Sequence, residues 1–361
     1  MKVFVLAASV ILSQLLATSA ESAVLRVATS EAEFELGCTH VLQGSIQSDD
    51  LEVLEAIFRE NLRTVLCLDS NGGSFITAIE ISEMIISNSY SVATAVPLEA
   101  SCTSACAIVF LFGQSIAFQG GSMEHPVPDR RLHVGAVLGL HSPYLDPSIV
   151  NDNDGQLYSA EQVGLAYTYA LQVVALLNQL RELRPRSFDD ILMTDMLLTP
   201  PGDMYYINTV AVASRLGIRM VGGTSEAIKE HMFENACHNA LLRGTESNRI
   251  QGFLNSENLA IDTELQTITL QHFRRGFGPQ DCSIRIDHQE YHGASTFPGS
   301  GPIVVTVSVG DVFVLFSPPG GAFFDPKARL ASLQRDQEAL LSDTEPSTVE
   351  EYFRLMVDRH N

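Results

Sequence analysis

Short apolar runs alternate with longer amphipathic stretches through the first two thirds of the chain. The pattern predicts strands at 34–46, 65–69, 91–96 and 134–141, and helices at 49–61, 74–87, 104–112 and 159–184. Residues 204–217 are expected to form a strand and then a short helix ended by Gly217. Such alternation is typical of ββα or βαβ units built around a mainly parallel sheet. The sequence therefore predicts an α/β domain over residues 24–223.

The pattern changes beyond about residue 224, where the sequence becomes irregular and favours strands. The clearest of these expected strands are 303–309 and 312–316. We expect a smaller β-rich C-terminal domain over residues 224–326, followed by an acidic helical tail over 327–361.

The first twenty residues have the organisation of a secretory signal. Lys2 gives a positive start, residues 3–16 are apolar, and residues 17–20 are mostly small. The alternative is a membrane anchor, but this run of about 14 residues is shorter than the roughly 20 that a spanning helix needs. We expect cleavage after Ala20 or Ser22, no later membrane span, and a periplasmic or secreted protein.

Composition narrows the classes of partner. The chain has 361 residues and a formal charge of −21, from 43 acidic and 22 basic side chains. Because this charge repels polyphosphate and anionic lipid, nucleic-acid binding is disfavoured.

Six cysteines in an exported chain favour disulfides, although spacing does not fix the pairing. Cys237 and Cys282 are expected to staple the C-terminal region. Cys38 and Cys67 lie on predicted strands and are equally compatible with simple burial.

Two further cysteines, Cys102 and Cys106, flank Ser104 with a spacing of four, for which three interpretations stay open. They can form a disulfide or thiol pair, be buried separately, or bind a metal with His125 and His133 as the nearest further ligands in the sequence. No metal or other cofactor is expected.

Three short motifs occur in one order: LDSNGGS at 68–74, CTSACA at 102–107 and GLHSPY at 139–144. A Gly-Gly pair after a strand lets backbone N–H groups approach an oxyanion. A serine that begins an apolar helix can act as a nucleophile, and a histidine at a strand end can be its base. Each motif alone is more often a turn, a helix cap or a structural histidine, so their joint occurrence carries the hypothesis.

The region around these motifs resembles the Clp protease and crotonase superfamily over about 190 residues. LDSNGGSFITAIEISEMI is similar to the family's strand, Gly-Gly turn and helix; CTSACA resembles its nucleophile turn; and GLHSPY resembles its His-x-Pro. The branch of exported, Clp-protease-like bacterial proteins with Cys-x-Ser-Ala-Cys is the most similar. The resemblance implies a spiral of ββα units that commonly assembles into rings or stacked trimers.

Carried over to this chain, the resemblance implies a serine peptidase site with Ser104 as nucleophile and His141 as base. The oxyanion donors would be the amides of Gly73 and Ala105. The family's acid position falls on Tyr205, a departure that leaves Asp203, two residues upstream, as the first candidate. Asp195 is an alternative acid, and a Ser/His pair without any acid is a third possibility. A further departure is Asn71, which replaces the family's proline.

Two related mechanisms are disfavoured. Signal peptide peptidase A enzymes use a lysine base, and no lysine lies between Lys2 and Lys229. Crotonase enzymes act on coenzyme A thioesters, which suits neither export nor a strongly acidic chain.

The leading hypothesis is an exported serine hydrolase, a peptidase acting on a peptide or protein substrate through Ser104, His141 and Asp203. The alternative is a catalytically inactive protein of the same fold that binds peptides or proteins in the cell envelope. We expect a homo-oligomer, and no ATPase partner, because ATP is lacking outside the cytoplasm.

Overall fold

The structure is a computed structural model, and it describes a defined part of the chain. The described residues are 22–61, 63–87, 91–119, 122–144, 160–184, 187–200, 202–222, 230–244, 258–262, 267–275, 278–288, 303–309 and 312–316. The predicted signal peptide and acidic tail lie outside them.

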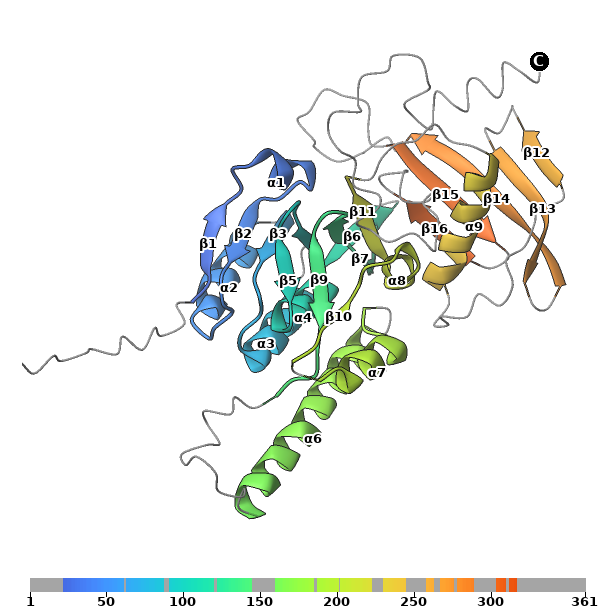
Figure 1. The fold of residues 1–361 in the computed structure, drawn as a ribbon. Helices are drawn as coiled ribbons and strands as arrows, with labels where there is room; N and C mark the ends of the chain where they lie inside the picture. The colour runs from blue at the N-terminus through green and yellow to red at the C-terminus, as the bar shows by residue number, and fades with distance from the viewer. Residues whose placement is uncertain are drawn as a thin grey trace, which may run out of the picture.

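An eight-stranded sheet forms the centre of the N-terminal region (Figure 1). Its strands are β1 (Val24–Val27), β2 (His40–Gln43), β3 (Arg63–Asp69), β4 (Ser91–Val96), β6 (Gln114–Gln119), β7 (Ser122–Pro128), β8 (Arg130–His133) and β11 (Ile218–Val221). Parallel pairings join β2 to β3, β3 to β4, β4 to β8 and β8 to β11. β1 is antiparallel to β2, and the β6–β7 hairpin adjoins β4.

A smaller sheet lies beside it and contains β5 (Ser101–Thr103), β9 (Val137–Leu140) and β10 (Tyr205–Tyr206). β5 and β9 are parallel, and β10 is antiparallel to β9. Two parallel bridges continue this layer, Ser70 with Cys102 and Ile46 with Gly73. After β2, β3, β4 and β8, the chain therefore crosses into this second layer before its next helix.

Eight helices lie in the described part of the chain. They are α1 (Glu31–Glu35), α2 (Asp50–Glu60), α3 (Phe75–Ser87), α4 (Ala105–Leu111), α6 (Ala160–Leu183), α7 (Asp190–Leu198), α8 (Val210–Arg215) and α9 (Glu230–Gly244). Every residue of α4 is buried, which explains its uninterrupted apolar sequence. The predicted mixed α/β class is confirmed.

Two sequence expectations need correction. The strand expected from residue 34 begins only at His40, because Ser30 and Glu33 form a capping box that starts α1. The strand expected at 134–141 is shorter, with β9 beginning at Val137 after a turn.

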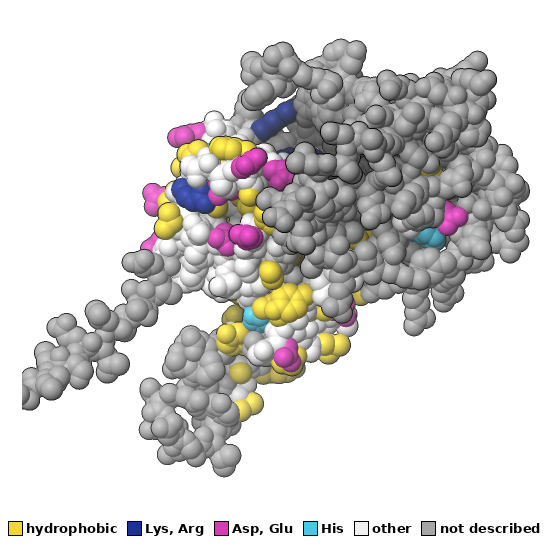
Figure 2. Space-filling model, turned by 45° about the horizontal axis from the view of Figure 1, so that its top comes forward, with side chains coloured by type: hydrophobic (Ala, Val, Ile, Leu, Met, Phe, Trp, Pro, Cys, Tyr) yellow, Lys and Arg dark blue, Asp and Glu magenta, His cyan; other side chains and the backbone are white. Residues whose placement is uncertain are grey.

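Helix α6 corrects a third expectation, that no segment after the signal is long and apolar enough to span a membrane. Among the described residues, Val163–Leu183 meets both criteria, and 17% of its most apolar window is buried. Core helices of soluble proteins also pass this test, so the finding is weak evidence for a span. The helix projects from the body of the protein (Figure 1), and hydrophobic side chains gather on the lower part of Figure 2.

The C-terminal region contains a five-stranded antiparallel sheet in sequence order. Its strands are β12 (Asn258–Asp262), β13 (Thr267–Arg275), β14 (Gly278–His288), β15 (Ile303–Val309) and β16 (Val312–Phe316). The last two occupy the ranges expected from the sequence. Cys237 of α9 and Cys282 of β14 form the expected disulfide, and Cys38 and Cys67 form another.

A buried ion pair fixes the start of α7. Asp189 accepts a hydrogen bond from the Leu192 N–H at 2.7 Å and also pairs with Arg215 of α8. The side chains of Asp189 and Arg215 are 9% and 1% exposed. Two further nitrogens of Arg215, Nε and Nη2, have no hydrogen-bond partner among the described residues. Loss of the Asp189 charge would therefore leave a buried cation without compensation.

We predict that Asp189→Asn lowers the free energy of unfolding by about 3 kcal/mol, because asparagine keeps the helix cap but loses the charge. The neighbouring Asp190 is exposed and pairs with Arg181, so Asp190→Asn should cost less than about 1 kcal/mol. The double variant Asp189→Asn/Arg215→Met should recover most of the loss. Urea unfolding measures all three, and equal effects of the two single variants would contradict the prediction.

Candidate active site

Ser104 lies at the turn from β5 into α4, with an unusual backbone. Its φ of 55° and ψ of −125° belong to a region that residues other than glycine rarely adopt. It is the N-cap residue of α4, but its side chain makes no capping hydrogen bond. The hydroxyl is therefore not used by the helix, and the side chain is partly exposed.

A disulfide spans this turn. Cys102 of β5 and Cys106 of α4 are joined, with their Cα atoms 5.2 Å apart and both side chains fully buried. The sequence left a disulfide, separate burial or a metal site open for these two cysteines, and the structure has the disulfide. The bond closes a short loop with Ser104 at its centre, and so restricts the turn from both sides.

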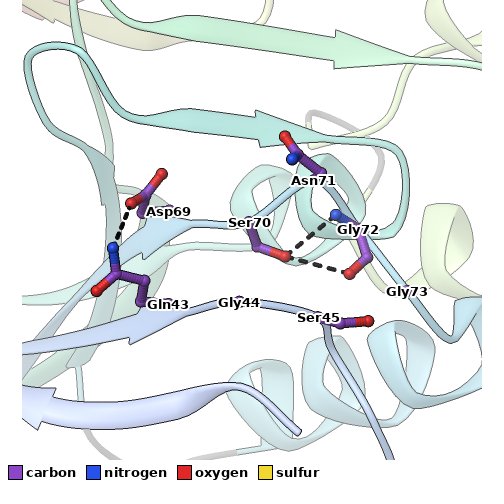
Figure 3. Close-up of a pocket in the computed structure, with 8 residues that line it drawn as sticks. All are labelled: Gln43, Gly44, Ser45, Asp69, Ser70, Asn71, Gly72 and Gly73. Atoms are coloured by element: carbon purple, nitrogen blue, oxygen red, sulfur yellow. Dashed lines mark hydrogen bonds between the residues drawn. The ribbon is translucent and has the colours of Figure 1, made fainter. Parts of the chain in front are cut away.

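The Gly-Gly loop packs directly against Ser104. A Cβ atom at Gly72 would lie 2.8 Å from the Ser104 Cβ and 3.1 Å from the Ala105 nitrogen. Gly72 also has a φ of +106°, so both space and backbone require glycine. The Ser70 hydroxyl accepts from the Gly72 N–H at 3.1 Å, a bond drawn in Figure 3.

Two backbone amides in this contact region, those of Gly73 and Ala105, donate no backbone hydrogen bond within the described part of the chain. The bridge to Ile46 uses the carbonyl of Gly72 and the N–H of Ser74, and the intervening Gly73 is exposed. Ala105 is the first residue of α4, where N–H groups have no partner inside the helix. The loop contact thus brings the two amides named from the sequence into one region.

Strand pairing places the three motifs side by side. Ser70 bridges to Cys102, and β5 pairs in parallel with β9 so that Thr103 is opposite Gly139. The Ser104 N–H donates to the Gly139 carbonyl at 2.9 Å. Since Ser104 and His141 both follow the carboxyl ends of neighbouring parallel strands, they leave the sheet at the same edge.

His141 is oriented by the backbone. Its Nδ1 lies 2.9 Å from the carbonyl oxygen of Ser142. A carbonyl only accepts, so in the neutral ring Nδ1 carries the proton and Nε2 keeps a free lone pair. The Ser142 N–H in turn donates to the Thr199 carbonyl at 2.9 Å, which ties this peptide to the end of α7. The ring also lies near Tyr144, with centroids 5.6 Å apart.

The two candidate acids lie in different settings. In the β9–β10 pairing, Tyr205 is opposite Leu140, so Asp203 reaches the same end of the sheet as His141. The Asp203 side chain is exposed, and within the described residues it makes no hydrogen bond with His141. Asp195 instead acts on the Tyr205 hydroxyl. Burial first, and then Asp195, raise the pKa of Tyr205 to about 12.

The sequence did not indicate several of these features. Gly72 packs against the serine, although only Gly73 was named from the sequence, and the glycine pair was a usable signal for this. The Ser142 carbonyl and the Tyr205–Asp195 pair had no such signal, because a backbone carbonyl is present at every residue. No hydrogen bond joins the side chains of Ser104 and His141 within the described part of the chain.

Comparisons with known proteins find similarity among solved structures. No protein-family model matches the chain, and no curated protein matches it. Among solved structures, a mutant of ClpP1 from Listeria monocytogenes is similar with a TM-score of 0.35 and 13% identity. The match covers 50% of this chain and 90% of that chain.

We predict that Gly72→Ala lowers the free energy of unfolding by about 1 to 3 kcal/mol, because the new Cβ meets Ser104 in a backbone conformation that alanine disfavours. Gly202→Ala is the matched control, since nothing lies within 4 Å of its Cβ position. The control should change stability by no more than about 0.5 kcal/mol. Urea unfolding compares them, and a harmless Gly72→Ala would refute the close packing.

Proposed function

We propose that this protein is an exported serine hydrolase, a peptidase with Ser104 as nucleophile and His141 as general base. The observation that carries the proposal is the joint placement of the Gly-Gly loop, Ser104 and His141 at the ends of adjoining strands. The three disulfides are compatible with export.

The proposed fold is the spiral of ββα units of the Clp protease and crotonase superfamily, with a separate C-terminal domain beyond residue 224. Support comes from the recurring path of the chain. The chain repeats one order of elements four times. Each repeat begins with a strand of the large sheet (β2, β3, β4 or β8), continues with a short strand or bridge of the second layer, and then reaches a helix.

In the proposed mechanism, the Ser104 Oγ attacks a peptide carbonyl while the His141 Nε2 accepts the hydroxyl proton. The Gly73 and Ala105 N–H groups stabilise the negative charge on the carbonyl oxygen. His141 then gives the proton to the departing amine, which leaves Ser104 acylated. Water, deprotonated by His141, attacks the acyl group and releases the acid and free Ser104.

We propose that the Ser142 carbonyl takes over the orienting role that a carboxylate has in most serine triads. A misplaced imidazole tautomer lowers turnover by about 10⁴-fold in a serine protease. The 2.9 Å contact with Ser142 selects the useful tautomer without an acid. What the carbonyl lacks is the negative charge that stabilises an imidazolium, so the site would be slower than a full triad.

The alternative function is a catalytically inactive peptide- or protein-binding module. It is favoured by one observation: within the described residues, no hydrogen bond connects Ser104 with His141 and no carboxylate contacts His141. Catalytic hydrogen bonds are often formed only with substrate present, so the two candidates need an experiment.

We predict that a fluorophosphonate probe labels the full chain at Ser104. Ser104→Ala should abolish labelling, and His141→Ala should slow it at least about 100-fold, because the general base is lost. Asp203→Ala should stay within about threefold of the wild type. Labelling rates followed by gel fluorescence and mass spectrometry provide the measurement. A folded wild type that does not label would favour the binding module, and loss of labelling in Asp203→Ala would restore that residue as the acid.

We predict a second effect, of the disulfide at the nucleophile turn. Cys102→Ala/Cys106→Ala should lower the labelling rate at least about tenfold, because Ser104 can then leave its strained conformation. The comparison is Cys237→Ala/Cys282→Ala, which removes a disulfide that closes a longer loop. Chain-entropy estimates give a stability loss of about 2 kcal/mol for the first pair and about 4 kcal/mol for the second. The second variant should label normally while folded; the opposite ranking of labelling rates would contradict the proposal.

We also propose a homo-oligomer formed through α6. No charged side chain occurs from residue 162 to 180, yet residues 163–168 are all exposed. Val163, Leu165 and Tyr167 are 57%, 63% and 66% exposed. Apolar area of this kind is normally covered by another surface.

We predict that Leu165→Glu/Leu171→Glu lowers the oligomer mass measured by light scattering to that of a monomer. Thr168→Glu, on an exposed polar position of the same helix, is the control for added charge. A wild-type protein that is already monomeric, and that binds detergent through α6, would instead point to a lipid surface.

A further inference from the structure

An open pocket of about 430 Å³ lies at the carboxyl ends of β2 and β3. Its lining residues are Gln43, Gly44, Ser45, Asp69, Ser70, Asn71, Gly72 and Gly73, drawn in Figure 3. Asp69 is the one ionisable side chain among them. We infer that this pocket binds a cationic group of a peptide, an ammonium or guanidinium, and that Asp69 determines this specificity.

The carboxylate of Asp69 is held in place by two neutral donors. Its Oδ2 accepts from Gln43 Nε2 at 2.9 Å, and its Oδ1 accepts from the Ser101 N–H at 3.2 Å. A carboxylate offers about four acceptor positions, so these two contacts leave positions for a further donor. Neither donor carries a charge, and the negative charge of Asp69 is fixed at the pocket without being cancelled by its lining.

Arg26 is the cation whose charge acts on this region, and its field reaches Asp69. Its guanidinium is already bound to Glu33, at 2.6 Å and 3.2 Å for its two nitrogens. This pairing, chiefly through the hydrogen bond from Arg26, lowers the pKa of Glu33 to about 2. Arg26 is therefore compensated by its own partner, and the pocket keeps its anionic character.

The same loop links the pocket to the proposed nucleophile. Gly72 and Gly73 line the pocket, and Gly72 is the residue that packs on Ser104. Asp69 precedes Gly72 by three residues, about 10 Å of extended chain. A peptide with its backbone at Gly72 and Gly73 can direct a long side chain such as lysine or arginine toward Asp69. The net charge of −21 also raises the local concentration of cationic peptides.

This inference deepens the proposed function by naming a substrate class, and it rests on that function only for turnover. Binding tests it separately. The probes are fluorescein-labelled hexapeptides of one sequence that carry lysine, norleucine or glutamate at one position, with an acetylated N-terminus. A fourth probe has a free N-terminus and no lysine, which distinguishes a terminal ammonium from a side chain.

The full chain with Ser104→Ala prevents turnover, and fluorescence anisotropy gives each Kd. We expect the lysine peptide to bind at least about tenfold more tightly than the norleucine peptide, and Asp69→Asn to remove that difference, since hydrogen bonds to a charged group are stronger than those between neutral groups. Asp49→Asn removes an equal charge from an exposed position in the turn before α2, and this variant should keep the preference for the lysine peptide.

Three outcomes would overturn the inference: equal affinity for lysine and norleucine peptides, a preference for glutamate, or a lysine preference that survives Asp69→Asn. Tight binding confined to the free N-terminus would assign the pocket to the terminal ammonium. Fluorophosphonate labelling of the wild-type chain is the independent readout of the nucleophile. It does not involve the peptides, so failure of the pocket and failure of the nucleophile are distinguishable.

Discussion

The strained backbone of Ser104 is the constraint on which the candidate site depends. A φ of 55° at a residue with a side chain persists only when its surroundings enforce it. Here the enforcing contacts are the Cys102–Cys106 disulfide, the Ser104 N–H bond to Gly139, and the close approach of Gly72. These contacts come from different segments of the chain. The backbone conformation of Ser104 therefore depends on the packing of three strand ends against one another.

Backbone groups, and not side chains, have most of the supporting roles proposed for the site. Amides of Gly73 and Ala105 are the proposed oxyanion donors, and the Ser142 carbonyl orients His141. The carboxylates nearby act elsewhere: Asp195 adds to the effect of burial in raising the pKa of Tyr205, and Asp69 belongs to the neighbouring pocket. Backbone groups are positioned by the elements that carry them. The Ser142 carbonyl is therefore held in part by the hydrogen bond from the Ser142 N–H to Thr199 at the end of α7, and the buried Asp189–Arg215 pair fixes the start of the same helix.

Sequence patterns predicted the elements with strong periodicity and clear ends. The helix expected at 49–61 is α2, with Asp49 and Asn61 as its caps, and the strand expected at 91–96 is β4. The motif at 102–107 also indicated the serine turn. The α1 helix was missed because a five-residue helix depends on one capping box and not on periodicity.

Contacts between distant segments were beyond the reach of these patterns. The partner of Cys38 was not predictable, since strand register decides which cysteines meet. The same holds for the pairing of Tyr205 with Leu140, which strand register also decides. The candidate nucleophile, base and oxyanion donors could be named from the sequence, whereas the group that orients the base required the structure.

The proposed site depends on a backbone carbonyl that sets the tautomer of His141. Long-range ¹⁵N–¹H NMR of protein labelled only at its 10 histidines reads this directly, with His141→Gln assigning the signal. At a pH where imidazole rings are neutral, we predict a protonated Nδ1 and an unprotonated Nε2 for His141. A protonated Nε2 would contradict it, because that ring can neither donate to Ser142 nor accept a proton from Ser104 at Nε2.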